Sequence, residues 1–126
     1  MGPQRPRPVV LDAGALIAVD RADRRVITLL ELADAIHVPA GALAQAWRNP
    51  ARQVRLVRVI ATDAVVVHAL DEAGARAAGQ LCAATHSSDV VDASVAILAR
   101  RLDAVTLTSD PDDLRRLDPA IDVVRC

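Results

Sequence analysis

The chain has 126 residues, the length of one ordinary domain with a full hydrophobic core. Apolar residues make up 52% of it, which excludes a disordered chain, and the net charge of −1 by itself indicates neither a nucleic-acid nor a membrane partner. Aromatic residues make up 1%, so the core must be built from aliphatic side chains. Fourteen of the sixteen acidic residues are Asp, which favours caps and turns over helix interiors, so the positions of these residues carry information.

Two cysteines and three histidines are spread along the chain. Cys82 and Cys126 form no CxxC pair, which favours a reducing compartment. His37, His68 and His86 are expected on separate strands and loops, so no zinc site is predicted. No apolar stretch has the length of a membrane span or the pattern of a signal peptide, so we expect a cytoplasmic protein with no membrane partner.

Short apolar runs alternate with helical patterns along the chain. Strands are predicted at residues 9–11, 36–38, 65–67, 104–107 and 121–124. Helices are predicted at residues 24–35, 41–49, 50–61, 71–84 and 89–102, with Pro50 separating two of them because proline can begin a helix but not continue one. This alternation predicts a single doubly wound domain over residues 1–126, with three α/β/α layers and a mostly parallel central sheet.

Acidic residues follow two of the predicted strands. Asp12 ends the first strand in VVLDAGALI, and Asp110 ends the fourth in AVTLTSD. Ligands of such sheets bind outside the carboxyl ends of the strands. Asp89 and Asp92 open the helix before the fourth strand, where their i, i+3 spacing places them on one face. Asp113 follows Asp110 by three residues on a short helix, so all five acids are candidates for one site.

Most of these acids also have a purely structural interpretation. Asp12 and Asp110 are good helix N-caps, and a negative charge at Asp89 suits the helix dipole. Asp92 lies among apolar neighbours and is expected to be half-buried, where capping does not explain it. Carboxylates brought together raise one another's pKa values, and a divalent cation such as Mg²⁺ resolves this repulsion. Such a metal cleaves phosphodiesters by polarising the phosphate and activating water.

The order and spacing of these segments resemble the PIN-domain ribonucleases and, within that family, the VapC-type toxins of bacterial toxin–antitoxin pairs. VVLDAGALIAVDR is similar to the family's opening strand and first acid. VVDASVAILARRLDAVTLTSD is similar to its third acid, helix, strand and fourth acid, and DPDDL to its trailing acid. VPAGALAQAW resembles the helix that bears the second acid, so the similarity spans nearly the whole chain.

The resemblance implies a PIN-like fold and a Mg²⁺- or Mn²⁺-dependent endoribonuclease that cleaves RNA. It further implies that the chain is the toxin of a toxin–antitoxin pair, that it forms a homodimer, and that a cognate antitoxin holds it inactive. By the same resemblance, Asp12 and Asp92 are the principal metal ligands. The resemblance also implies that Asp110 and Asp113 complete the acidic cluster or hold metal-bound water. Asp110 is further assigned as a metal ligand.

One position departs from the family pattern. Gln45 stands where the family normally has Glu, and its amide has the same length but no charge. Two interpretations follow: Asp89 supplies the missing charge as a catalytic residue, or the chain is a weakened, PIN-like module that binds RNA or an antitoxin without cleaving. We favour the first interpretation, because the free-energy cost of bringing the remaining acids together is otherwise unexplained.

Basic residues follow Gln45. Arg48, Arg52 and Arg55 recur at near-helical spacing, and we predict that they contact RNA phosphates beside the acidic site, the alternative being an exposed, solvated face. Trp47 is the only aromatic residue, which argues against a base-stacking platform and suits a core or interface anchor.

Overall fold

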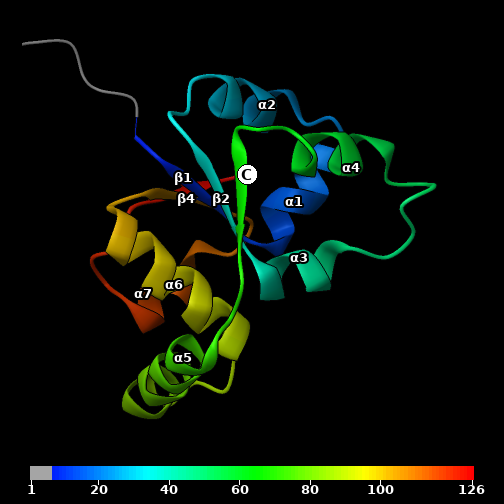
Figure 1. Cartoon of the computed structure of the whole chain (residues 1–126). Helices are drawn as coiled ribbons and strands as arrows, with labels where there is room; N and C mark the ends of the chain where they lie inside the picture. The colour runs from blue at the N-terminus through cyan, green and yellow to red at the C-terminus, as the bar shows by residue number, and fades with distance from the viewer. Residues whose placement is uncertain (1–6) are drawn as a thin grey trace, which may run out of the picture.

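The computed structural model describes residues 7–126, which form one five-stranded sheet with helices on both faces (Figure 1). The strands are β1 (Val9–Leu11), β2 (Ile36–Pro39), β3 (Val65–His68), β4 (Val105–Thr108) and β5 (Val123–Arg125). They lie in the order β3-β2-β1-β4-β5, and every pair of neighbours is parallel. The predicted parallel sheet is therefore confirmed.

Strand β1 lies at the centre of the sheet and is buried along its whole length. Val10 is level with His37 of β2 on one side and with Thr106 of β4 on the other. Leu11 is level with Leu107, so β1 and β4 end side by side at the same edge of the sheet. The residues that follow these two strands therefore start next to each other.

The helices form two layers on opposite sides of the sheet, as Figure 1 shows. One layer contains α1 (Ala13–Asp20), α2 (Arg24–Glu31), α3 (Ala40–Ala46) and α4 (Val54–Ile60), and the other contains α5 (Glu72–Thr85), α6 (Val90–Leu102) and α7 (Pro111–Leu117). This is the predicted three-layer α/β/α architecture. None of the helices in residues 7–126 combines the length and the apolar character needed to cross a bilayer.

Aspartate side chains begin four of these helices, which accounts for four of the fourteen aspartates. Asp12, Asp23, Asp71 and Asp89 each accept hydrogen bonds from backbone N–H groups in the first turn of α1, α2, α5 and α6. Each such cap typically contributes about 1 kcal/mol to stability. Asp110 begins α7 without a side-chain cap, so its capping interpretation is wrong in that respect.

Some element boundaries differ from the predictions. The helices predicted at 41–49 and 50–61 are shorter, because residues 47–53 form turns rather than helix. The Gln53 side chain holds these turns: its Oε1 accepts from the N–H groups of Arg48 and Asn49, and its Nε2 donates to the Ala46 carbonyl. The helix predicted at 24–35 ends at Glu31, and the last strand runs one residue beyond its predicted end.

The core is aliphatic, as the composition requires, and lies in two parts. The larger part surrounds β1 and includes side chains from both helix layers, among them Leu16, Leu56 and Leu98. The smaller part lies between α5, α6 and α7 and contains Cys82, a free thiol. Trp47 is partly buried against the larger part, which agrees with its predicted role as an anchor.

Thr106 is the one buried side chain among the described residues whose hydroxyl has no hydrogen-bond partner. We expect Thr106→Val to raise the free energy of unfolding by about 1 kcal/mol, because valine has the same shape without the unpaired oxygen. Urea unfolding measures this, with Thr106→Ala as the control that should destabilise by removing a buried methyl group as well. A loss of stability in Thr106→Val would show that the hydroxyl is paired in solution.

Candidate functional site

Asp12 lies at the end of β1 and is only 7% exposed. Its Oδ1 accepts the N–H of Ala15 at 2.9 Å, so it is a genuine helix cap. The Thr108 side chain lies close enough to this carboxylate to lower its pKa, and the N–H of Asp110 donates to Thr108 Oγ1 at 2.9 Å. Burial raises the pKa of Asp12, and the hydrogen bonds from Thr108, Ala15 and Gly14 oppose that rise. Thr108 thus ties the acids that follow β1 and β4 to each other.

A close backbone approach at Gly14 supports this arrangement. A Cβ atom at position 14 would lie 2.0 Å from Ser109 Oγ and 2.8 Å from Ser109 Cβ. Only glycine therefore allows the first turn of α1 to lie against the turn that follows β4. The sequence carries no signal of this contact, because it depends on the relative positions of two distant segments.

Asp92 is half-buried in the first turn of α6, as predicted. Burial and the adjacent charge and hydrogen bond of Asp89 raise the pKa of Asp92 to about 7, with smaller contributions from Asp12 and Asp113. Asp89 caps α6 by accepting the N–H of Asp92 at 2.9 Å. Its structural role is thus real, and its carboxylate still lies beside that of Asp92.

Asp110 and Asp113 form a second pair of neighbouring carboxyl groups, on α7. The hydrogen bond to Asp110 and the charge of Asp110 raise the pKa of Asp113, while the charge of Arg116 opposes this rise. The guanidinium of Arg116 lies 3.7 Å from the Asp113 carboxylate. Asp89 and Asp113 also interact electrostatically, so the pairs on α6 and α7 belong to one acidic cluster.

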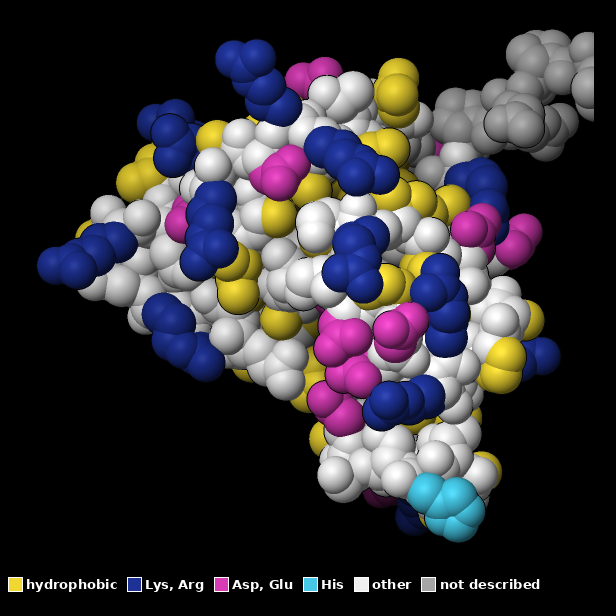
Figure 2. All heavy atoms as spheres, turned by 180° about the vertical axis from the view of Figure 1, so that it is seen from behind, with side chains coloured by type: hydrophobic (Ala, Val, Ile, Leu, Met, Phe, Trp, Pro, Cys, Tyr) yellow, Lys and Arg dark blue, Asp and Glu magenta, His cyan; other side chains and the backbone are white. Residues whose placement is uncertain are grey.

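Three of the five predicted acids line one cleft, with a volume of about 180 Å³. Acidic side chains gather into a patch on the rear face of the molecule, with arginines around it (Figure 2). Asp12 and Asp110 do not line the cleft but follow β1 and β4, where Asp12 helps to raise the pKa of Asp92 and Asp110 that of Asp113. The residues that line the cleft are Thr85, His86, Ser87, Ser88, Asp89, Asp92, Asp113, Arg116 and Leu117.

The acids are not arranged as a ready-made metal site. Within residues 7–126, no three His, Cys, Asp or Glu side chains lie together in a way that already suits a metal ion. The pKa values of Asp12 and Asp92 are raised mainly by burial, with smaller contributions from neighbouring carboxylates, and that of Asp113 is raised mainly by Asp110. A group of carboxylates with perturbed pKa values beside a cleft is a candidate functional site on physical grounds.

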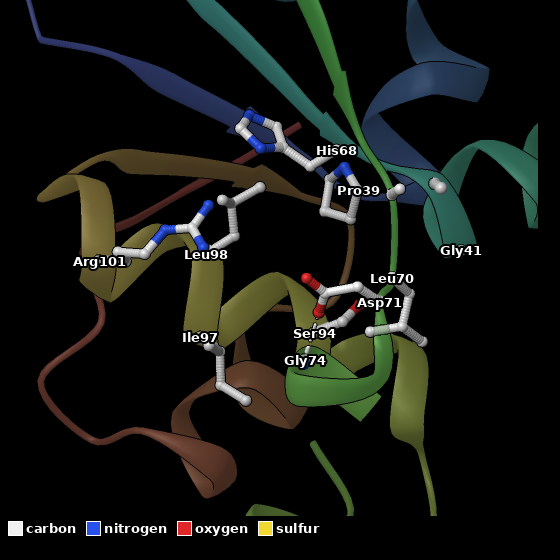
Figure 3. A pocket seen from close by; sticks show the side chains of 12 residues that line it. Pro39, Gly41, His68, Leu70, Asp71, Gly74, Ser94, Ile97, Leu98 and Arg101 are labelled. Atoms are coloured by element: carbon white, nitrogen blue, oxygen red, sulfur yellow. Dashed lines mark hydrogen bonds between the residues drawn. The ribbon is translucent and has the colours of Figure 1, made fainter. Parts of the chain in front are cut away.

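A larger hollow of about 260 Å³ lies elsewhere, between the ends of β2 and β3 and the side of α6 (Figure 3). None of the five acids lines it, so we assign the acidic chemistry to the smaller cleft. His68 lines this hollow and its Nε2 lies 2.8 Å from Nδ1 of His37. These two histidines lie on separate strands, as predicted, but the strands are neighbours and bring the rings together. No third metal-ligating side chain in residues 7–126 joins the pair.

Gln45 lies exposed on α3 and makes no side-chain hydrogen bond with the described residues. The three predicted RNA-contacting arginines do not share a helix face, because only Arg55 lies on a helix. Arg48 donates to the carbonyls of Ala44 and Trp47 at the end of α3, and Arg52 lies in the following turns. Their RNA contacts remain a prediction, whereas Arg116, which no sequence pattern singles out, lies at the acidic cleft.

Comparison with known structures identifies the fold. The chain is similar to one in the crystal structure of VapBC2 from Rickettsia felis bound to a DNA fragment from their promoter, with a TM-score of 0.70 and 14% identity over 94% of this chain and 98% of that chain. It is also similar to one in the structure of FitAB bound to an IR36 DNA fragment, with a TM-score of 0.62 and 17% identity over 93% of this chain and 94% of that chain. No family model and no curated protein matches the sequence. The three-layer, PIN-like fold is thus confirmed by structure.

The raised pKa of Asp92 predicts a pH-dependent stability. Without metal, the folded protein holds this proton up to about pH 7, whereas the unfolded chain loses it near pH 4, so stability falls as the pH rises between these values. We expect Asp92→Asn to raise the free energy of unfolding at pH 8 by about 2 kcal/mol, allowing for solvent screening, and to have little effect at pH 4.

Urea unfolding in EDTA at both pH values measures this difference. Asp63→Asn, in an exposed turn outside the cluster, serves as the matched control. Equal stability of wild type and Asp92→Asn at pH 8 would contradict the description of Asp92 as a destabilised carboxylate.

Proposed function

We propose that this chain is a metal-dependent endoribonuclease and the toxin of a toxin–antitoxin pair. The observation that carries the proposal is the grouping of five carboxylates at the ends of β1 and β4 and the starts of α6 and α7, with the pKa of Asp92 raised to about 7. The structural likeness to chains from VapBC2 and FitAB supports the same role. The α/β sheet with acids at its carboxyl edge favours the toxin over the antitoxin.

The donor set fits Mg²⁺ or Mn²⁺. All five groups are hard oxygen donors, and their mutual repulsion is the cost that a divalent cation offsets. Asp12 and Asp92 would hold the ion, with Asp110 as a further ligand. The exposure of Asp89 and Asp113 permits these side chains to rotate on binding. When bound, the metal supplies charge neutralisation at the scissile phosphate and an activated water.

The chain's own residues position the reacting groups. Thr108 holds Asp12 from its buried side, which fixes one carboxylate on the rigid sheet. Asp89 accepts the N–H of Asp92, which orders the first turn of α6 and so fixes the position of Asp92. Asp113, whose pKa the neighbouring Asp110 raises, holds a proton more readily than an isolated carboxyl group and could act in proton transfer beside the metal ligands.

The missing acid at Gln45 leaves a second candidate function, a PIN-like module that binds RNA or an antitoxin without cleaving. The observation that favours it is the lack of a ready-made metal site in residues 7–126. We prefer the enzyme, because Asp89 places its carboxylate beside Asp92 and lines the same cleft.

The proposed role includes a cognate antitoxin and a homodimer as partners. Exposed apolar side chains support a protein partner: Ile17 on α1, Leu32 at the end of α2 and Val54 on α4 are 36%, 69% and 46% exposed. These helices pack together in one layer. Apolar side chains left on one layer suit coverage by a helix of an antitoxin or by a second copy.

RNA cleavage in the presence of Mg²⁺ tests the enzymatic proposal. We expect the wild type to cleave, Asp92→Asn to be inactive, and Asp89→Asn to be slower by about a hundred- to a thousandfold, the usual effect of losing one charge-stabilising group. Gln45→Glu should give little gain, because the cluster already carries the charge. The assay is a time course on structured and unstructured RNA, with EDTA as the metal-free control.

Other outcomes separate the alternatives. Cleavage that is insensitive to Asp89→Asn would refute the compensating role of Asp89 and leave the nuclease intact. An inert wild type that gains activity in Gln45→Glu would identify a weakened nuclease. If the wild type and every variant are as inactive as Asp92→Asn, the remaining interpretation is a module that binds RNA or an antitoxin without cleaving.

A further inference from the structure

The hollow between the ends of β2 and β3 and the side of α6 lies apart from the acidic cleft and has charged and apolar walls of its own. Its volume of about 260 Å³ lies just below the roughly 300–1,000 Å³ of sites for drug-sized ligands, so it suits a smaller molecule. Figure 3 shows Arg101 and His68 toward one end of the hollow and Asp71 and Leu70 toward the other. Apolar side chains of α6 and of the segment before α5 line much of the remainder.

Arg101 lies in the last turn of α6 and brings a positive charge to this hollow. None of the acidic side chains in residues 7–126 forms an ion pair with it. Arg100, the residue before it, lies 3.8 Å from the Asp118 carboxylate and does not line the hollow. A basic residue in the last turn suits the helix dipole, which explains both arginines but not the position of Arg101 at the hollow. The charge of Arg101 is therefore available to an anion there.

The histidine pair is influenced by Arg101 and is neutral at pH 7. Burial is the main reason why the pKa values of His37 and His68 lie below their usual value, and the charge of Arg101 lowers both further. No carboxylate in residues 7–126 contributes to these pKa values. Two neutral imidazoles carry two N–H groups, and the 2.8 Å contact between the rings uses one of them. One imidazole N–H is left to donate to another acceptor.

The charges around the hollow match an organic anion with a single negative charge. Arg101 is the one cation that lines the hollow among the described residues, and guanidinium binds carboxylate in a bidentate, charge-assisted manner. Asp71, toward the other end, caps α5 by accepting the N–H of Gly74 at 2.7 Å, and its charge opposes a second negative charge in the hollow. The apolar wall favours a ligand that also has an apolar body.

We propose that this hollow binds a small organic carboxylate, whose carboxylate group is held by Arg101 and the His37–His68 pair. The apolar body of the ligand lies against the apolar side chains of α6. A bound anion stabilises a protonated imidazole, so binding takes up a proton and becomes tighter as the pH falls. The inference goes beyond the proposed function and does not depend on RNA cleavage.

Benzoate tests the inference, with benzamide as its uncharged counterpart and acetate as an anion without the apolar ring. In NMR titrations of the untagged protein at constant ionic strength, saturating benzoate should raise the apparent pKa of the His37–His68 pair by about 1, the effect of one nearby opposite charge. Benzamide should not change it. Acetate should bind about tenfold more weakly than benzoate, because it buries less apolar surface. The NMR signals of His86, which lines the acidic cleft, should not respond and serve as the internal control.

Variants of the same protein identify the residues that hold the carboxylate. Arg101→Gln should weaken benzoate binding about tenfold, the usual effect of losing hydrogen bonds to a charged partner. Arg100→Gln, the matched control from the same turn of α6, should bind as the wild type does. In a His37→Gln/His68→Gln double variant, which keeps polar side chains that do not titrate, the affinity should no longer rise as the pH falls from 7 to 5. Thermal unfolding should show that all variants are folded.

Three results would each overturn the inference. Equal binding of benzoate by Arg101→Gln and Arg100→Gln would show that Arg101 does not hold the carboxylate. Binding of benzamide as tight as that of benzoate would show that the hollow takes apolar molecules and does not recognise an anion. No response of the His37 and His68 signals at the highest soluble concentration of benzoate would show that the hollow binds no such ligand.

Discussion

The in-register pairing of β1 with β4 is the constraint on which the candidate site depends. Leu11 lies level with Leu107, so Asp12 emerges level with Thr108. The Thr108 side chain lowers the pKa of Asp12, and its Oγ1 accepts the N–H of Asp110. Because side chains alternate along a strand, a slip of one residue would turn Thr108 away from Asp12. The Asp12 carboxylate is therefore held in place by the sheet and not by a flexible loop. Functional sites need side chains that are held rigidly in this way.

The grouping of these carboxylates lowers the stability of the folded chain. Burial raises the pKa of Asp12, and burial together with Asp89 raises that of Asp92 to about 7. Arg116 is the only cation that contacts the cluster among the described residues, and it does so from an exposed position. Strongly shifted carboxylates are typical of functional sites, where binding of a ligand or an ion compensates for a cost that folding alone does not. In the proposed function, a divalent cation would offset this cost.

The sequence predicts the parallel sheet and the five acids because both follow from local patterns. From the sequence, capping a helix and taking part in a site are alternatives for Asp12 and Asp89. In the structure, each caps a helix with one carboxylate oxygen, which leaves the other oxygen available to the site. The sequence does not predict the place of Arg116 or the pairing of His37 with His68, which depend on helix orientation and strand register. It also misplaces the helix ends near residues 47–53, where a side chain and not the backbone pattern decides the turns.

The central claim is that these carboxylates share a divalent cation. Anomalous diffraction from a crystal grown with Mn²⁺ tests it most directly, because the ion identifies its own ligands. The account predicts one strong peak within coordination distance of the Asp12 and Asp92 oxygens, at about 2.0–2.2 Å as for other small divalent cations. Saturating Mn²⁺ with no peak at the cluster, or with peaks only at other surface acids, would contradict it.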